Sequence, residues 1–227
     1  ITNTGIVVNK RHVSGITAFG PRVRIIGNTI KNVYGDSTNT DQYGIYTKTS
    51  YSVITDNTLV DAGGNQACIM TKGSPNDLND ILTNSVAENA TNDVNIVSHN
   101  ILALDTRQNS TMKYTGIATF NSGMNISSNT IRGFNEGIVT IAPIVPNVDG
   151  SGVLLDNIPA VSVIGNVICD NVIDGLFGIA DSDVVAIMLN NPSAVIVDNN
   201  KISTKTKLGT GIESNVRGIY ALCNPAL

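Results

Sequence analysis

The chain has 227 residues, of which 41% are hydrophobic and 14% are charged, and its formal net charge is −4 at neutral pH. This balance is too apolar for a disordered chain and too poor in charge for a coiled coil. No cluster of Lys and Arg offers a footprint for nucleic-acid phosphates, and no apolar run reaches the length of a transmembrane helix. We therefore expect a folded protein with neither a nucleic-acid partner nor membrane insertion.

One motif recurs along the chain: an apolar residue, two further residues, Asn, one residue and a second apolar residue. It occurs as IIGNTI, ITDNTL, VSHNIL, ISSNTI, VIGNVI and VDNNKI, with its asparagines at Asn28, Asn57, Asn100, Asn129, Asn166 and Asn200. A Gly-Ile pair begins 13 residues before three of these asparagines, at Gly15, Gly44 and Gly116. Such internal repetition is typical of a solenoid.

The asparagines step by 29, 43, 29, 37 and 34 residues, which suits one coil of a parallel β-solenoid with insertions. We interpret the step of 43 as two short coils. The short runs of Val and Ile broken by Gly, Asn and Asp favour strands over helices. Residues 74–85 are consistent with either a short helix, capped by Ser74, or a loop.

Asparagine at a fixed place in each coil has a structural explanation. Asn tolerates the left-handed backbone conformation that a tight turn needs. Coils stacked about 4.8 Å apart also allow its amides to form a ladder of hydrogen bonds. We therefore predict that the asparagine ladder stabilises the fold and takes no part in chemistry.

The pattern resembles the right-handed parallel β-helix proteins of the pectin-lyase-like superfamily: pectate and pectin lyases, polygalacturonases and bacteriophage tailspikes. The resemblance covers roughly residues 5–220. It implies an all-β, single-stranded right-handed parallel β-helix of roughly eight to ten coils. Residues 1–227 would form one such domain, cut from a longer chain whose flanking domains cap the rod. A tailspike-like rod would also assemble as a homotrimer.

One segment resembles the polygalacturonases more specifically. Asn39-Thr40-Asp41 is followed by Gly44-Ile45, in the order of that family. The paired aspartates of the family would precede Cys68-Ile69, where this chain has Gln66 and Ala67. Only Asp41 therefore corresponds to a catalytic residue of the family.

The Gly-Ile pairs predict which side chains stack from coil to coil. His12 lies three residues before Gly15, and Asp41 lies three residues before Gly44. On successive coils the two residues would be about one strand spacing apart. An imidazole beside a carboxylate suits general acid–base catalysis, although a surface ion pair of little consequence is the competing interpretation.

Two loops form the best candidate for a sugar groove. The first carries Asp36, Asp41, Tyr34 and Tyr43, and the second carries Asp61, one coil later and close to Lys72. Tyrosine rings can stack on pyranose rings. Carboxylates one coil apart match the separation in retaining glycosidases, and two coils apart approach that in inverting enzymes.

A lyase mechanism remains an alternative to hydrolysis. It needs a base and a cation or metal that neutralises charge, and Arg11, Arg22 or Lys72 are the available cations.

No metal or other cofactor is expected from the cysteines, because Cys68, Cys169 and Cys223 lie far apart and form no zinc motif. We interpret them as small buried thiols. Calcium is the one ion that the acidic residues suggest. Asp174, Asp181 and Asp183 offer hard oxygen ligands, but a solvated loop is the favoured interpretation of these residues.

We therefore expect a tailspike-like rod that recognises and cleaves a cell-surface or capsular polysaccharide, as a glycoside hydrolase or lyase. Its location would be extracellular or on the surface of a virion. The alternative is a structural or adhesive β-helix that binds glycans or other subunits without catalysis. Carboxylates gathered in one groove would favour cleavage, and carboxylates dispersed among turns would favour binding alone.

Overall fold

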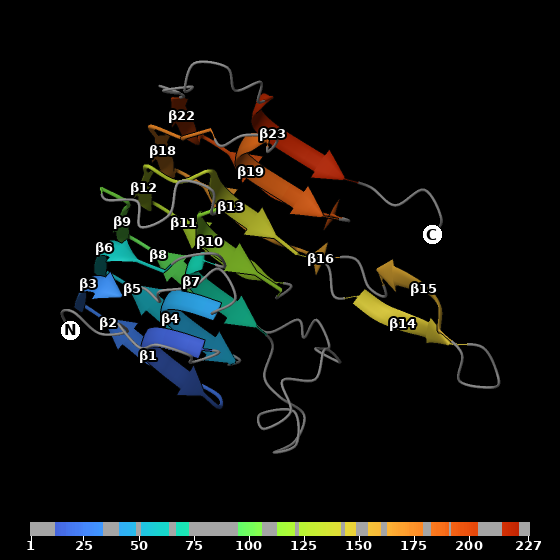
Figure 1. Ribbon diagram of the computed structural model, residues 1–227, viewed down its shortest axis with the longest axis horizontal. Coiled ribbons are helices and arrows are strands. Elements are labelled where there is room, and N and C mark those ends of the chain that lie inside the picture. Colours follow the sequence, from blue (N-terminus) through green and yellow to red (C-terminus); the bar gives the residue numbers. More distant parts are fainter. Residues whose placement is uncertain are drawn as a thin grey trace.

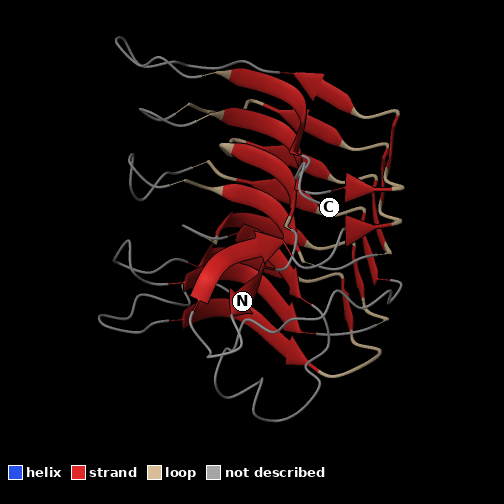
Figure 2. Ribbon diagram, turned by 90° about the vertical axis from the view of Figure 1, so that its right-hand side faces the viewer, coloured by secondary structure: helices blue, strands red, loops and turns tan. Residues whose placement is uncertain are grey.

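The computed structural model describes residues 12–33, 41–48, 51–63, 67–72, 95–105, 113–120, 123–141, 144–148, 154–159, 163–178, 183–190, 192–203 and 215–222. These residues form strands, corners and no helix. Three all-parallel sheets are stacked in register, so the expected all-β parallel β-helix is confirmed (Figures 1 and 2). None of the described segments is a helix that could span a membrane.

Each sheet receives one strand from every coil. Sheet 1 contains β1 (His12–Phe19), β4 (Asp41–Lys48), β7 (Ala67–Lys72), β10 (Thr115–Thr119), β13 (Glu136–Thr140), β19 (Val184–Asn190) and β23 (Val216–Leu222). Sheet 2 contains β2 (Arg24–Ile26), β5 (Val53–Thr55), β8 (Asn95–Ser98), β11 (Met124–Ser127), β17 (Val167–Cys169) and β21 (Ile196–Asp198). Sheet 3 contains β3 (Thr29–Val33), β6 (Thr58–Ala62), β9 (Ile101–Ala103), β12 (Thr130–Arg132), β18 (Val172–Asp174) and β22 (Lys201–Ser203).

The described strands make six complete coils and the first strand of a seventh, fewer than the eight to ten expected. The interpretation of the 43-residue step as two coils is wrong, because β5 pairs directly with β8, with Ile54 opposite Val97. The additional residues are inserted between β7 and β8 within a single coil. The segment 74–85, predicted as a helix or loop, lies outside the described residues.

The asparagine ladder runs along the corner between sheets 2 and 3. The Nδ2 of Asn57 donates to the Oδ1 of Asn100 at 3.0 Å, and the Nδ2 of Asn100 donates to the Oδ1 of Asn129 at 3.0 Å. The Oδ1 of Asn100 also accepts from the backbone N–H of Asn57, and its Nδ2 donates to the carbonyl of Ile54. Each fully buried amide in the ladder therefore has both of its polar atoms satisfied.

The ladder contains Asn171 in place of the predicted Asn166. Asn129 donates to the Oδ1 of Asn171, which in turn donates to Asn200. The true steps are therefore 29, 43, 29, 42 and 29 residues. Asn166 lies at the corner before sheet 2, where its Oδ1 accepts from the backbone N–H of Met124 at 2.9 Å. The sequence pattern selected Asn166 because Asn166 and Asn171 are only five residues apart and have similar sequence neighbours.

The predicted backbone role of the ladder asparagines is also wrong. A left-handed conformation occurs at the residue before each of them: Gly27, Asp56, His99, Ser128, Asp170 and Asn199 have φ angles between 47° and 67°. Asparagine is required instead for its side-chain donor and acceptor. His99 is exposed, as expected for a residue at the outside of the corner.

The core explains the Gly-Ile pairs. Ile45, Ile69, Ile117, Ile138 and Ile187 are fully buried and stack in one column. The residue before each isoleucine must be small, because the side chains of sheet 3 approach it closely. A Cβ added at Gly44 would lie 2.5 Å from the Cδ2 of Leu59. Cys68 and Ala186 are the small residues at this place in the coils that lack the glycine.

One insertion departs from the coil pattern. The strands β14 (Ile144–Val148) and β15 (Leu154–Pro159) form an antiparallel hairpin between β13 and the next parallel pair, β16 (Val163–Ile164) with β20 (Pro192–Ser193). Figure 1 shows the hairpin projecting beyond the ends of the stacked strands. It accounts for the long step from Asn129 to Asn171.

We predict that Asn100→Ala lowers the free energy of unfolding by about 3 kcal/mol, because it leaves a buried N–H of Asn57 and a buried carbonyl of Ile54 without partners. Asn28→Ala is the matched control. Asn28 is half-buried at the end of the ladder and donates only to Ile26 and Asn57, so its loss should cost about 1 kcal/mol. Urea unfolding monitored by circular dichroism measures both values. Equal losses would contradict a structural role for the ladder.

Candidate functional site

The outer face of sheet 1 carries a second apolar cluster, separate from the core. Its members are Tyr43, Tyr46, Ala67, Met70 and Ala118, with Phe120 and Ile141 packed against them. Side chains alternate across a strand, and Ile45 belongs to the core, so its neighbour Tyr46 lies on the opposite face. The aromatic residues within the described strands, Phe19, Tyr43, Tyr46 and Tyr220, all lie in sheet 1.

Aromatic rings and a lysine meet on this face. The rings of Tyr43 and Tyr46 have centroids 4.8 Å apart, and Phe19 meets Tyr46 edge-on at 6.3 Å. The Nζ of Lys72 lies 4.9 Å from the centroid of the Phe120 ring and 6.0 Å from that of Tyr46. These are distances at which a cation is attracted to the negative face of a ring.

Exposure divides this aromatic cluster into an inner and an outer part. Tyr43 and Tyr46 are only 4% and 3% exposed, whereas Phe19 is 44% exposed and Lys72 and Phe120 are half-buried. Tyr43 and Lys72, which were predicted to be neighbours, lie on one face, and each of them contacts Tyr46. The more exposed part of the cluster consists of Phe19, Lys72 and Phe120, and the buried ring of Tyr43 packs against that of Tyr46.

His12 and Asp41 are register partners in β1 and β4. The prediction that they are backbone neighbours on successive coils is therefore confirmed. Their side chains, and the whole of Tyr34 and Asp36, lie outside the described residues. Of the two arginines considered for a lyase, Arg22 is an exposed corner residue with a φ of 61°, and Arg11 is outside the described residues.

Asp61 is the fourth residue of β6 (Thr58–Ala62), close to the end of that strand, and its φ angle is 50°. It is buried, and its Oδ1 accepts a hydrogen bond of 2.8 Å from the backbone N–H of Asp105. Asp105 in turn forms an ion pair with Arg132 at 3.1 Å. The carboxylate of Asp61 is thus engaged in joining two coils.

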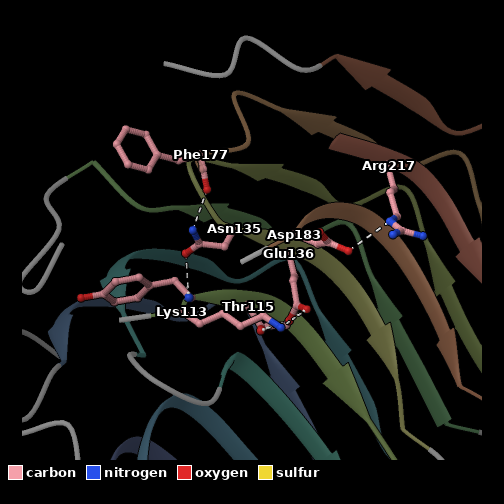
Figure 3. A network of polar contacts seen from close by, with 8 residues as sticks. Lys113, Thr115, Asn135, Glu136, Phe177, Asp183 and Arg217 are labelled. Atoms are coloured by element: carbon pink, nitrogen blue, oxygen red, sulfur yellow. Dashed lines mark hydrogen bonds and ion pairs between the residues drawn. The ribbon is translucent and has the colours of Figure 1, made fainter. Parts of the chain in front are cut away.

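Glu136 is a buried carboxylate on the outer face that the sequence analysis did not single out. Its Oε1 lies 2.5 Å from the Nζ of Lys113, and its Oε2 accepts a hydrogen bond of 2.8 Å from the hydroxyl of Thr115 (Figure 3). The signal was present in the sequence, because Glu136 directly precedes Gly137-Ile138 as Tyr43 directly precedes Gly44-Ile45. Equal offsets from the Gly-Ile pair place both residues in one column.

A second charged group lies at the last coil. The Nε of Arg217 is 3.1 Å from the Oδ2 of Asp183, and Asn215 donates to the Oδ1 of the same carboxylate at 3.0 Å. The guanidinium carbon of Arg217 lies 4.0 Å from the centroid of the Tyr220 ring. Figure 3 shows Arg217 and Asp183 pointing toward each other.

The acidic residues considered for calcium do not converge in the described part of the chain. Asp183 pairs with Arg217, Asp174 accepts from the hydroxyl of Ser203, and Asp181 lies outside the described residues. No group of three His, Cys, Asp or Glu side chains there is arranged to hold a metal ion.

Neither described cysteine is an activated nucleophile. Burial raises the pKa of the Cys68 thiol far above its ordinary value. The pKa of Cys169 is also raised, first by desolvation and then by a hydrogen bond to Asp170 and by the charges of Asp170 and Asp198. Both thiols therefore stay protonated at neutral pH, in contrast to the thiolate that nucleophilic catalysis needs.

Comparison with family models, with curated proteins and with solved structures finds no significant match for this chain.

We predict that Lys113→Ala lowers the free energy of unfolding by about 1–2 kcal/mol, because it leaves the buried carboxylate of Glu136 without its cation. Arg132→Ala is the matched control, since the pair of Arg132 with Asp105 is exposed on both sides and should contribute less than about 0.5 kcal/mol. Denaturant titration distinguishes the two variants. A loss no larger for Lys113→Ala than for Arg132→Ala would show that burial adds nothing to the pair.

Proposed function

We propose that this protein binds a cell-surface or capsular polysaccharide along the outer face of sheet 1. The observation that carries the proposal is the ammonium group of Lys72 over the rings of Phe120 and Tyr46, with the exposed ring of Phe19 against Tyr46 on the same face. Aromatic faces stack on the C–H faces of sugar rings, and an adjacent ammonium group donates hydrogen bonds to hydroxyl or acidic substituents.

The sheet itself supports a linear, repetitive ligand. Its strands are parallel and follow one another at a constant spacing of about 4.8 Å. Equivalent side chains therefore recur along one line, and a polymer lying across the strands meets them in succession. Small-molecule sites are usually concave, whereas a long polymer gains its affinity from many contacts on an open face.

Cleavage of the bound polysaccharide is the second proposed function, and the register of His12 with Asp41 favours it. An imidazole and a carboxylate on adjacent strands suit proton transfer to and from a glycosidic bond. In this proposal Asp41 is the catalytic carboxylate, Asp36 is its partner, and Tyr34 and Lys72 position the sugar. Asp61 and Tyr43 take no part in it, because Asp61 accepts a hydrogen bond from the backbone of Asp105 and Tyr43 is only 4% exposed.

Binding without cleavage has support of its own. Asp56, Asp105 and Asp170 lie at corners between strands, Asp61 lies near the end of β6, and Glu136 is paired with Lys113. The carboxylates whose side chains are described are thus spread over the coils, as expected for an adhesive or structural rod.

We extend the proposal to the assembly and its location. Parallel sheets stacked in register support a rod of the pectin-lyase-like kind, and the aromatic face supports a tailspike-like role. In this role the rods assemble as a homotrimer on the cell exterior or on the surface of a virion. Sedimentation equilibrium of the purified chain tests the trimer directly.

We predict that Lys72→Ala weakens polysaccharide binding about tenfold, which corresponds to about 1.4 kcal/mol. The probes are purified capsular polysaccharides, O-antigen polysaccharides, polygalacturonate and dextran, each titrated by calorimetry. Lys31→Ala is the control, because Lys31 is an exposed lysine on sheet 3. Equal affinity of the two variants for a polymer that the wild-type protein binds would place the site elsewhere.

We predict that the protein releases new reducing ends from a polysaccharide that it binds, and that Asp41→Asn lowers this rate at least a hundredfold while binding persists. Absorbance of unsaturated uronates is recorded in parallel, because their appearance would mean a lyase and direct attention to Lys72 and Arg22. Binding without any cleavage would establish the adhesive alternative.

A further inference from the structure

We infer that Arg217 and Tyr220 form a second subsite for the same polysaccharide, so that the protein selects long chains over short ones. The inference rests on the proposed function and adds to it a site at the last coil and a requirement on ligand length. It arises from the positions of this pair in the register of sheet 1.

Arg217 and Tyr220 occupy the same two columns as the tyrosine pair of the second coil. Successive strand pairings lead from Tyr46 through Met70, Ala118, Val139 and Met188 to Tyr220. In the neighbouring column, Tyr43 pairs with Ala67, and Thr115 pairs successively with Glu136, Val185 and Arg217. The register of β7 with β10, in which Ile69 is opposite Ile117, places Ala67 in line with Thr115. The same outer face therefore carries an aromatic group near each end of the stack.

The terminal pair is both oriented and accessible. Arg217 is held by its ion pair with Asp183, and Asp183 is itself held by Asn215. The guanidinium lies over the Tyr220 ring at 4.0 Å, and both side chains are half-buried. The buried Tyr43–Tyr46 pair has no such access. A ring stacked by a fixed guanidinium offers a sugar one apolar surface and several hydrogen-bond donors.

A polymer can reach this pair and Lys72 at the same time. The strand order β7-β10-β13-β19-β23 separates them by four spacings, about 19 Å in all at about 4.8 Å each. Between them, the column that runs from Tyr46 to Tyr220 contains Ala118, Val139 and Met188, which bear no charge. Once one end of a long chain is bound, the second contact is intramolecular and adds affinity by effective concentration. A disaccharide is too short to make both contacts.

The test uses fragments of graded length. Whichever polymer of the panel above binds the wild-type protein is cut by mild acid and fractionated from disaccharide to about twelve sugars. We expect the affinity to rise at least tenfold over a narrow range of length, where a fragment first spans both subsites. Tyr220→Ala should abolish this rise and leave the affinity for the shortest binding fragments unchanged.

Two controls protect the interpretation. Tyr220→Phe keeps the ring and should retain the rise, and Lys201→Ala alters an exposed lysine of the preceding coil on another sheet and should change nothing. The thermal unfolding midpoint of each variant shows whether β23 is still folded. A variant that unfolds early is replaced by Arg217→Gln, which keeps the ring and removes the guanidinium.

The outcomes are distinguishable. If the affinity does not depend on fragment length while Lys72→Ala still weakens binding, the second subsite is overturned and the proposed function stands. An equal loss of affinity for short and for long fragments in Tyr220→Ala would also overturn the second subsite. If no polymer of the panel binds the wild-type protein, the proposed function and this inference fail together.

Discussion

The corner between sheets 2 and 3 depends on one interaction, the asparagine ladder. The corner has two residues between strands, and the second of them is buried in the central coils, where its backbone N–H needs a side-chain acceptor in the next coil. An amide side chain solves this problem because it donates to one neighbouring coil and accepts from the other. Aspartate would bring an uncompensated charge and no donor, so asparagine recurs at Asn57, Asn100, Asn129 and Asn171.

The ladder also determines the geometry of the outer surface. Because each coil is held one strand spacing from the next, residues at equal offsets form straight columns over all three sheets. Insertions of different length are absorbed at the corners, as between β7 and β8, and leave the columns unchanged. Tyr43, Glu136 and Arg217, which are far apart in the chain, consequently lie in one line on sheet 1.

The proposed function uses this regularity. Along the outer face, aromatic groups occur near both ends, and the charges of Glu136 and Asp183 are each matched by a cation within the face. In the proposed function this surface binds a polymer mainly through stacking and directed hydrogen bonds, and little through net charge.

The fold class could be derived from the sequence because a solenoid repeats its local rules in every coil. The recurrence of apolar residues around asparagine and the small residue before each core isoleucine are visible in the amino-acid sequence. The same repeat is sufficient to predict that His12 lies opposite Asp41 on the next coil. The number of coils could not be derived, because a long step is equally consistent with an insertion and with an extra coil.

Other features were decided only by the tertiary structure. Asn171 and Asn166 have similar sequence surroundings, and only strand pairing shows which one continues the ladder. The contacts of Phe19 and Lys72 with Tyr46, and the ion pair that holds Glu136, depend on neighbours from other coils. The sequence by itself determined the repeat and therefore the architecture, since these follow from interactions within one coil and its image in the next. Which side chains are accessible, paired or committed to the fold was decided by contacts between distant segments, which no local pattern records.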